Sequence, residues 1–314
     1  MIYIVGTGPM AQGHAKVLVY LEKAFTVIGR GKPSADSFYD NMGIQPFIGG
    51  INAFLNSNQF NEQDSVIIAT GTEALMSTLK KALLAGAGKV LIEKPAAISI
   101  EELLENEEFL RPFGNKVFVA YNRRFYASVA EAMKLIEEDG GLESMHFEFT
   151  EWAHKIEPLD KAPGVKENWF FANSTHVVDL AFFIAGKPKE WSAYAQSGKL
   201  DWHNKTKFAG AGITDNGVIF SYHSNWESAG RWGIELNTHK RKIILKPLES
   251  IFIQELGSIE RVEHEFNDGF DVIFKPGLIN QLAAFLSDYS VTLCNLHDHV
   301  ENTNAIYNKM VSSK

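Results

Sequence analysis

The sequence predicts an α/β fold in two parts: an N-terminal doubly wound parallel sheet, then an α+β part with a large, mostly antiparallel sheet. Three observations lead to this prediction. Short apolar runs alternate with helix-length segments through residues 1–120, as in βαβ units. A glycine-rich turn follows the first apolar run. After about residue 140 the pattern becomes apolar/polar alternation at period two, which indicates an antiparallel sheet with one covered face. We therefore expect one domain over residues 1–120 and a second over residues 121–314.

The composition excludes several classes of protein. The chain has 314 residues, of which 45% are hydrophobic and 22% charged, as in ordinary globular proteins. A net charge of −8 without a basic tract argues against a nucleic-acid partner. The single cysteine, Cys294, cannot form an intramolecular disulfide and suggests a reducing compartment. No apolar run reaches the roughly 18 residues that span a bilayer, so we expect a cytoplasmic protein without a membrane partner.

The first apolar run, Ile2–Val5, leads directly into the turn GTGPMA. This is the G-x-G-x-x-A pattern, in which the first glycine permits a tight turn and the second lets the backbone approach a pyrophosphate. A helix-like segment follows, and its first amides would face the phosphates. The pattern predicts a dinucleotide cofactor bound at Gly6, Gly8, Pro9 and Met10.

The residues after the second strand decide which nicotinamide cofactor fits. The strand Phe25–Ile28 is followed by GRGKPS, with no acid before Asp36. An acid at this point would accept the ribose hydroxyls of NAD. Arg30 and Lys32 can instead pair with a 2′-phosphate through charge-assisted hydrogen bonds. We therefore expect NADP, with NAD as the alternative if both cations are only solvated.

Later strands of the first part also end in polar residues. The strand at 65–69 ends in Thr70, and the strand at 90–92 ends in Glu93, Lys94 and a proline. In an open parallel sheet, ligands bind outside the carboxyl ends of the strands, so Lys94 is a candidate proton donor. The alternative is a surface lysine at the start of a loop. A further strand at 116–120 leads to Tyr121, Asn122 and two arginines.

Four motifs, GTGPMAQGH, ATGT, EKPAAIS and AYNRRF, resemble those of the glucose-fructose oxidoreductase/inositol dehydrogenase/MocA (Gfo/Idh/MocA) family in order and spacing. The resemblance covers nearly the whole chain. It implies that Lys94 sits beside the nicotinamide in substrate binding and proton transfer, with Glu93 beside the cofactor and Asn122 at the same site. It also implies a substrate site on one side of the antiparallel sheet. The other side would form the interface of a homodimer or homotetramer.

The segment Asn168–Gly186 predicts a helix in the second part, capped by Asn173 or Ser174 and ended by glycine. His176 would lie in its first turn, where the helix dipole disfavours the cationic imidazole. From the residues alone, a structural role for His176 is equally open. The resemblance implies that this helix start supplies a catalytic histidine.

One departure from the family pattern concerns proton transfer. The family often carries an acid four residues before that histidine, where this chain has Ala172. Asn173 can hydrogen-bond a hydroxyl group but cannot act as a general base. We therefore expect Lys94 and His176 to handle the proton. The expected substrate-side residues are Asn122, Arg124, Trp152, Asn173 and His176, with Arg124 as the contact for an anionic group.

These features predict an NAD(P)-dependent oxidoreductase that transfers a hydride between its cofactor and a sugar, sugar nucleotide or related polyol. Two alternatives remain open: an inactive NAD(P)-binding regulator of the same fold, and a sugar–sugar oxidoreductase with a tightly held cofactor. We expect no metal site, because His297 and His299 lack other clustered ligands in the sequence.

Overall fold

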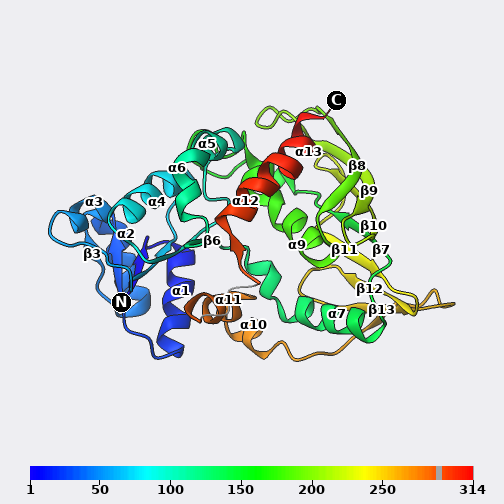
Figure 1. Cartoon of the computed structure of the whole chain (residues 1–314), viewed down its shortest axis with the longest axis horizontal. Helices are drawn as coiled ribbons and strands as arrows, with labels where there is room; N and C mark the ends of the chain where they lie inside the picture. The colour runs from blue at the N-terminus through cyan, green and yellow to red at the C-terminus, as the bar shows by residue number, and fades with distance from the viewer. Residues whose placement is uncertain (288–291, 314) are drawn as a thin grey trace. The chain divides into compact units, whose positions relative to one another are not determined.

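The computed structural model describes residues 1–287 and 292–313, which form two compact units (Figure 1). Unit 1 comprises Met1–Tyr121 and Ile273–Asn302, and unit 2 comprises Asn122–Val272 and Thr303–Lys314. The first boundary lies one residue from the expected one. The return of residues 273–302 to unit 1 was not expected, because it depends on a strand pairing between distant parts of the chain.

Unit 1 contains a seven-stranded sheet in the order β15-β6-β5-β4-β1-β2-β3. Strands β1 to β6 are parallel and β15 pairs antiparallel with β6. This is the doubly wound order, so the predicted fold class is confirmed for this part. The strands are β1 Ile2–Val5, β2 Phe25–Gly29, β3 Phe47–Ile48, β4 Ser65–Ile68, β5 Lys89–Ile92, β6 Val117–Val119 and β15 Cys294–Asn295.

The parallel strands are short and mostly apolar, as in a sheet that is covered on both faces. Ile4, Ile67 and Leu91 have no exposed surface. The Ser99 hydroxyl caps a helix by accepting a hydrogen bond from the amide of Glu102 at 3.1 Å, as its sequence position suggests. The helices of this unit are α1 Pro9–Tyr20, α2 Lys32–Met42, α3 Gly50–Leu55, η1 Thr72–Ala74, α4 Leu75–Leu84, α5 Ile100–Glu105, α6 Glu107–Leu110, η2 Arg111–Phe113, α11 Leu278–Leu286 and α12 Leu296–Asn302.

Unit 2 is built on an eight-stranded sheet in the order β14-β13-β12-β11-β7-β10-β9-β8. All neighbours are antiparallel except β7 and β10, which confirms the mostly antiparallel sheet. The strands are β7 Ser144–Glu148, β8 Pro188–Gln196, β9 Lys207–Thr214, β10 Ile219–Asn225, β11 Gly233–Asn237, β12 Arg241–Leu245, β13 Phe252–Glu255 and β14 Val262–Glu263.

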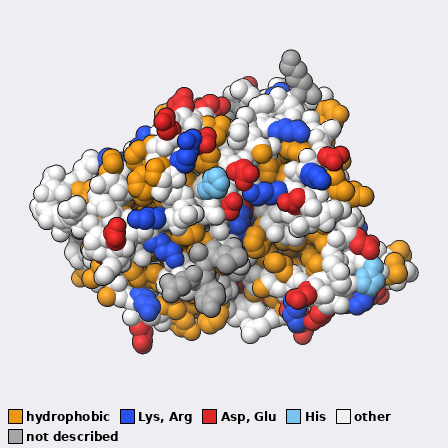
Figure 2. All heavy atoms as spheres, in the orientation of Figure 1, with side chains coloured by type: hydrophobic (Ala, Val, Ile, Leu, Met, Phe, Trp, Pro, Cys, Tyr) orange, Lys and Arg blue, Asp and Glu red, His pale blue; other side chains and the backbone are white. Residues whose placement is uncertain are grey.

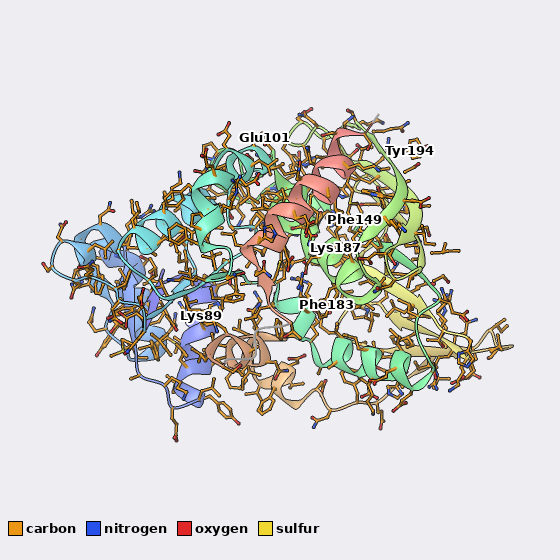
Figure 3. The ribbon with its side chains drawn as sticks, in the orientation of Figure 1. Lys89, Glu101, Phe149, Phe183, Lys187 and Tyr194 are labelled. Atoms are coloured by element: carbon orange, nitrogen blue, oxygen red, sulfur yellow. The ribbon has the colours of Figure 1, made fainter. Side chains whose placement is uncertain are left out.

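Helix α9 packs against one face of this sheet. Phe182 of the helix makes edge-on contacts with Phe147 of β7 and Phe220 of β10, at 5.6 and 5.1 Å between ring centroids. Phe149, labelled in Figure 3, extends this aromatic core. The helical segments are η3 Asn122–Phe125, α7 Ala127–Glu138, α8 Ala153–Ile156, the π-helical η4 Phe170–Ser174, α9 Thr175–Ala185, α10 Gly269–Ile273, η5 Thr303–Tyr307 and α13 Asn308–Ser312.

The start of α9 differs from the expected capped terminus. Ser174 has helical backbone angles and makes no side-chain cap, and the π-helical η4 runs directly into α9. The amides of α9 therefore already lie within a helical path, and His176 does not occupy a free helix N-terminus. The dipole argument for His176 is wrong for this reason. The predicted end is confirmed, since Gly186 follows the helix with a φ of 92°.

Surface charge is mixed. Lys and Arg side chains alternate with Asp and Glu side chains over the face shown in Figure 2. In the described part of the chain, no helix is both long enough and apolar enough to cross a bilayer.

Buried His203 makes the stability of unit 2 depend on pH. Its Nδ1 donates to the carbonyl of Lys205 at 2.6 Å, and its Nε2 accepts from the amide of Phe170 at 3.5 Å. This is a neutral imidazole, and burial lowers its pKa to about 4. The unfolded chain, with a pKa of about 6.5 for this group, binds the proton first as the pH falls. The contribution of neutral His203 is complete above about pH 6.5 and is lost as the pH falls towards 4.

When the pH is lowered from 7 to 5, His203 is expected to lower the free energy of unfolding by about 2 kcal/mol. Urea denaturation of the protein at both pH values measures the loss. In His203→Phe, which cannot titrate, the loss is expected to be smaller by that amount. An identical pH dependence in both proteins would contradict the assignment.

Candidate functional site

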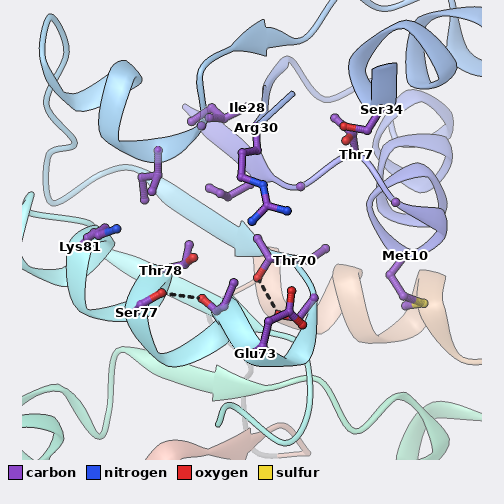
Figure 4. A pocket seen from close by; sticks show the side chains of 18 of the residues that line it. Thr7, Met10, Ile28, Arg30, Ser34, Thr70, Glu73, Ser77, Thr78 and Lys81 are labelled. Carbon is purple, nitrogen blue, oxygen red and sulfur yellow. Dashed lines mark hydrogen bonds between the residues drawn. The ribbon is translucent and has the colours of Figure 1, made fainter. Parts of the chain in front are cut away.

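A cavity of about 650 Å³ lies in unit 1 at the carboxyl ends of β1, β2 and β4 (Figure 4). Six of the predicted cofactor residues line it: Gly6, Gly8, Pro9, Met10, Arg30 and Thr70. Among the residues described, its lining does not include Lys32, Glu93, Lys94 or Asn122. The sequence analysis missed the contribution of α4, which adds Ser77, Thr78 and Lys81. A helix face turned towards a ligand carries no motif of its own, so no sequence signal marked these three.

The glycine turn between β1 and α1 fits a pyrophosphate. Gly6 has a φ of 128°, and a Cβ there would lie 2.2 Å from the carbonyl oxygen of Ala69, so only glycine is accommodated. A Cβ at Gly8 would meet no atom within 4 Å, which leaves room above the turn. Helix α1 begins at Pro9, and no side chain of the described residues caps its amides. These amides are suited to bind an anion.

The two cations expected to select NADP occupy different surroundings. Arg30 lines the cavity together with Ser34, and Figure 4 shows its side chain directed from β2 towards Thr70. Lys32 forms an exposed ion pair with Asp36, with its Nζ 2.9 and 2.8 Å from the two carboxylate oxygens. Arg30 is therefore the cation of this pair that faces the cavity.

The turn that carries Lys94 is held on both sides by buried histidines of unit 1. Nε2 of His14, in α1, lies 3.3 Å from a carboxylate oxygen of Glu93. Nε2 of His299, in α12, donates to the carbonyl of Pro95 at 2.8 Å. Both histidines have no exposed surface. Two separate helices therefore contact the residues on either side of Lys94, one at the Glu93 side chain and the other at the Pro95 backbone.

His299 thus has a hydrogen-bonding role in unit 1. In the described residues, no group of three or more His, Cys, Asp or Glu side chains is placed to hold a metal ion.

In unit 2, Trp232 lies at the centre of a group of stacked side chains, which we call the Trp232 cluster: Arg123, Trp152, His176, Arg231 and Trp232. The guanidinium carbons of Arg123 and Arg231 each lie 4.6 Å from the Trp232 ring centroid. Arg231 is also 4.6 Å from the Trp152 ring, and the His176 ring is 6.2 Å from Trp232. Cation–π contacts at these distances are attractive. Two predicted site residues, Trp152 and His176, are therefore joined through a tryptophan that the sequence analysis did not select.

A buried carboxylate lies beside the segment that precedes His176. Glu151, only 2% exposed, accepts hydrogen bonds from Asn173 Nδ2 at 3.0 Å and Ser174 Oγ at 2.8 Å. Its other oxygen lies 3.5 Å from Arg231. The expected cap is therefore corrected: these two side chains bind Glu151 instead of the helix amides. Sequence reasoning missed Glu151 because it sought an acid only within a few residues of His176.

Arg124 and Asn122 are both placed in unit 2. Arg124 forms a bidentate ion pair with Asp179, with its nitrogens 2.7 and 2.6 Å from the two carboxylate oxygens. Burial raises the pKa of Asp179, and the Arg124 guanidinium opposes that rise. Arg124 also lies 4.8 Å from the ring of Phe183, labelled in Figure 3. Its guanidinium is thus engaged in the interior of unit 2, while Asn122 is 4% exposed.

Comparison with known proteins supports the sequence resemblance. Residues 1–121 match the Gfo/Idh/MocA model, described as an oxidoreductase family with an NAD-binding Rossmann fold. No curated protein sequence matches the chain.

Three solved structures illustrate the fold. Levoglucosan dehydrogenase in complex with NADH and L-sorbose is 16% identical, with a TM-score of 0.73 over 98% of this chain and 96% of that one. UDP-N-acetylglucosamine 3-dehydrogenase from Acidithiobacillus ferrooxidans is 15% identical, with a TM-score of 0.70 over 99% and 97% of the two chains. An oxidoreductase from Agrobacterium radiobacter in complex with NAD⁺, L-tartaric acid and magnesium is 15% identical, with a TM-score of 0.70 over 98% and 95%. At these identities the likeness concerns the fold. Together with the motifs and the glycine-turn cavity, the family match identifies residues 1–121 as an NAD-binding Rossmann domain of the Gfo/Idh/MocA type.

Proposed function

We propose that the protein is an NAD(P)-dependent oxidoreductase acting on a CH–OH group of a sugar, sugar nucleotide or related polyol. The observation that carries this proposal is the cavity at the glycine turn of unit 1. In the same unit, strand β5 is followed directly by Glu93 and Lys94. Two structures of similar fold are a levoglucosan dehydrogenase and a UDP-N-acetylglucosamine 3-dehydrogenase, which supports a carbohydrate-type substrate.

The proposed roles of the cofactor and of the side chains follow from their chemistry. The nicotinamide, when bound, supplies or accepts the hydride. Lys94 gives or takes the hydroxyl proton, with His176 as its partner or substitute, and such positioned acid–base groups typically contribute about 10²–10⁴-fold to a rate. The hydrogen bonds from His14 and His299 favour this role, because they hold the turn around Lys94 in one conformation.

For the substrate side we propose the remaining predicted residues, Asn122, Trp152 and Asn173. Glu151 orients the Asn173 amide, so that its carbonyl oxygen remains able to accept a hydrogen bond from a hydroxyl group. Trp152 is 47% exposed, and its Nε1 is fixed by a hydrogen bond to the Gly230 carbonyl at 2.9 Å. A fixed indole with an exposed face is suited to stack on a sugar ring.

NADP is the proposed cofactor, and Arg30 the main residue that selects it. Arg30→Gln is expected to raise the dissociation constant of NADPH by about 10–100-fold, since a hydrogen bond to a charged group is worth about 1.5–3 kcal/mol. The dissociation constant of NADH should change less than about twofold. Titration of protein fluorescence with each cofactor measures both constants.

Lys32→Gln provides the matched comparison. Because Lys32 is exposed and paired with Asp36, its loss should weaken NADPH binding far less than the loss of Arg30. An equal loss of affinity for NADPH and NADH in Arg30→Gln would contradict the preference for NADP.

We also propose a cytoplasmic homodimer or homotetramer, formed through the uncovered face of the unit 2 sheet. Tyr194 and Ile219 are 58% and 63% exposed there, and Tyr194 is labelled in Figure 3. Ala209 pairs with Tyr194, and Ala211 lies on the same face between them. Contiguous exposed apolar surface of this kind is typical of an interface.

Turnover of the purified protein tests the proposed function. The protein is incubated with NADP or NADPH and a panel of sugars, polyols and sugar nucleotides, and absorbance at the nicotinamide band is followed. Turnover with any of them supports the proposal. Cofactor binding without turnover on the whole panel would favour the regulator, whereas reduction of one sugar at the expense of another without added cofactor would favour the sugar–sugar oxidoreductase.

A further inference from the structure

Arg123 is a half-buried cation that lacks an ionic partner among the described residues. Its Nε is buried and has no hydrogen-bond acceptor, and among the described residues its guanidinium forms neither a hydrogen bond nor an ion pair. Burial lowers the pKa of Arg123, which the nearby Tyr126, Glu249 and Glu151 only partly oppose. An unpaired charge taken out of water is costly. The adjacent Arg124 has its carboxylate in Asp179, so the two neighbouring arginines differ sharply.

The carboxylates near the Trp232 cluster are already engaged. Glu151 binds Asn173, Ser174 and Arg231. Glu249 interacts electrostatically with both Arg123 and Tyr126. Arg123 and Arg231 both lie over Trp232, and of these two arginines only Arg231 is ion-paired with Glu151 among the described residues.

Arg123 lies over two buried aromatic rings. Its guanidinium carbon is 4.6 Å from the ring centroid of Trp232 and 5.9 Å from that of Tyr126. Trp232 and Tyr126 are only 5% and 3% exposed, so the rings hold the guanidinium at this place. A guanidinium with N–H groups that no described residue uses is suited to bind the two oxygens of a carboxylate or a phosphate.

We propose that Arg123 recognises an acidic group of the substrate, so that the preferred carbohydrate carries a carboxylate or a phosphate. That the ligand is a carbohydrate rests on the proposed function. Arg123 takes the place of Arg124, the arginine that the sequence analysis expected to contact an anionic group. The bound anion supplies the missing counter-charge of Arg123. Because Trp232 contacts both Arg123 and His176, the anion would bind close to the His176 ring.

Binding to the NADP-loaded protein tests the proposal without any turnover. Isothermal titration compares D-glucose with D-glucuronate and D-glucose 6-phosphate, and inorganic phosphate serves as a sugar-independent probe. At least one anionic sugar is expected to bind at least about tenfold more tightly than D-glucose, and the stronger of the two identifies carboxylate or phosphate as the group recognised. Arg123→Gln should abolish this preference, so that the anionic sugars bind no more tightly than D-glucose does to the same variant.

Two further variants keep the result interpretable. Arg123→Lys retains the charge without the planar fork and should keep part of the preference, which also covers the case in which Arg123→Gln does not fold. Arg111→Gln removes a cation that is 70% exposed on unit 1 and should change nothing.

Equal affinity for neutral and anionic sugars, with no binding of phosphate, would overturn the proposal. Persistence of the preference in Arg123→Gln would do the same and would leave Arg123 as a stacking residue only. An anion preference found without hydride turnover on any substrate would support the role of Arg123 and overturn only the proposed oxidoreductase function.

Discussion

Replacing Lys94 by methionine is expected to lower turnover by about 10²–10⁴-fold, the usual contribution of a positioned acid–base group. Methionine keeps an unbranched side chain of similar length and has no amino group to give or take a proton. Among the described residues, the lining of the glycine-turn cavity does not include Lys94, so the dissociation constant of NADPH should change little. Steady-state kinetics on the best substrate and fluorescence titration of NADPH measure the two quantities separately.

Lys116→Met is the matched control, because Lys116 is an exposed lysine just before β6. It should retain full turnover. A Lys94→Met enzyme with wild-type kcat would exclude Lys94 as the proton donor. A proportional loss of NADPH affinity would instead assign Lys94 to cofactor binding.

Replacing Asp179 by alanine is expected to destabilise unit 2 by about 3–5 kcal/mol, the range found when one partner of a buried ion pair is removed. Asp179 and Arg124 are 1% and 10% exposed, so the remaining guanidinium would be left in the interior without its counter-charge. All six tryptophans of the chain lie between residues 152 and 232. Urea denaturation followed by tryptophan fluorescence therefore reports the unfolding of unit 2.

The double variant Arg124→Met/Asp179→Leu separates loss of the pair from loss of one partner. Removing both charges is expected to cost much less than Asp179→Ala alone, because no buried ion remains unpaired. A single variant within about 1 kcal/mol of the wild-type protein would show that the pair is hydrated in solution.

The N-terminal part was predictable because its signals are local. Each parallel strand is a short apolar run, and the glycine turn has one structural solution. Strands β8 and β9 of unit 2 carry no comparable local signal. The alanine and glycine residues of β9, such as Gly210 and Gly212, do not favour a strand by themselves. Pairing with β8 and β10 holds them in the sheet.

The site was predictable only as far as motifs extend. Gly6, Gly8 and Arg30 could be found because a fingerprint specifies their spacing. Glu151 lies 22 residues before Asn173, whose amide it binds, and no spacing rule links them. The sequence analysis chose Arg124 for an anionic ligand, and only the fold shows that this arginine is paired with Asp179 instead.

The return of residues 273–302 to unit 1 restricts how such a protein can be divided. A fragment ending at Tyr121 would lack β15, and with it the strand that pairs with the outer edge of β6. It would also lack α11, whose Leu278 lies against Gly13 of α1, and α12, whose His299 binds the turn at Pro95. The nucleotide-binding module is therefore discontinuous along the gene. An exchange of unit 2 between homologues would therefore have to replace two separate segments, residues 122–272 and residues 303–314, rather than one continuous C-terminal piece.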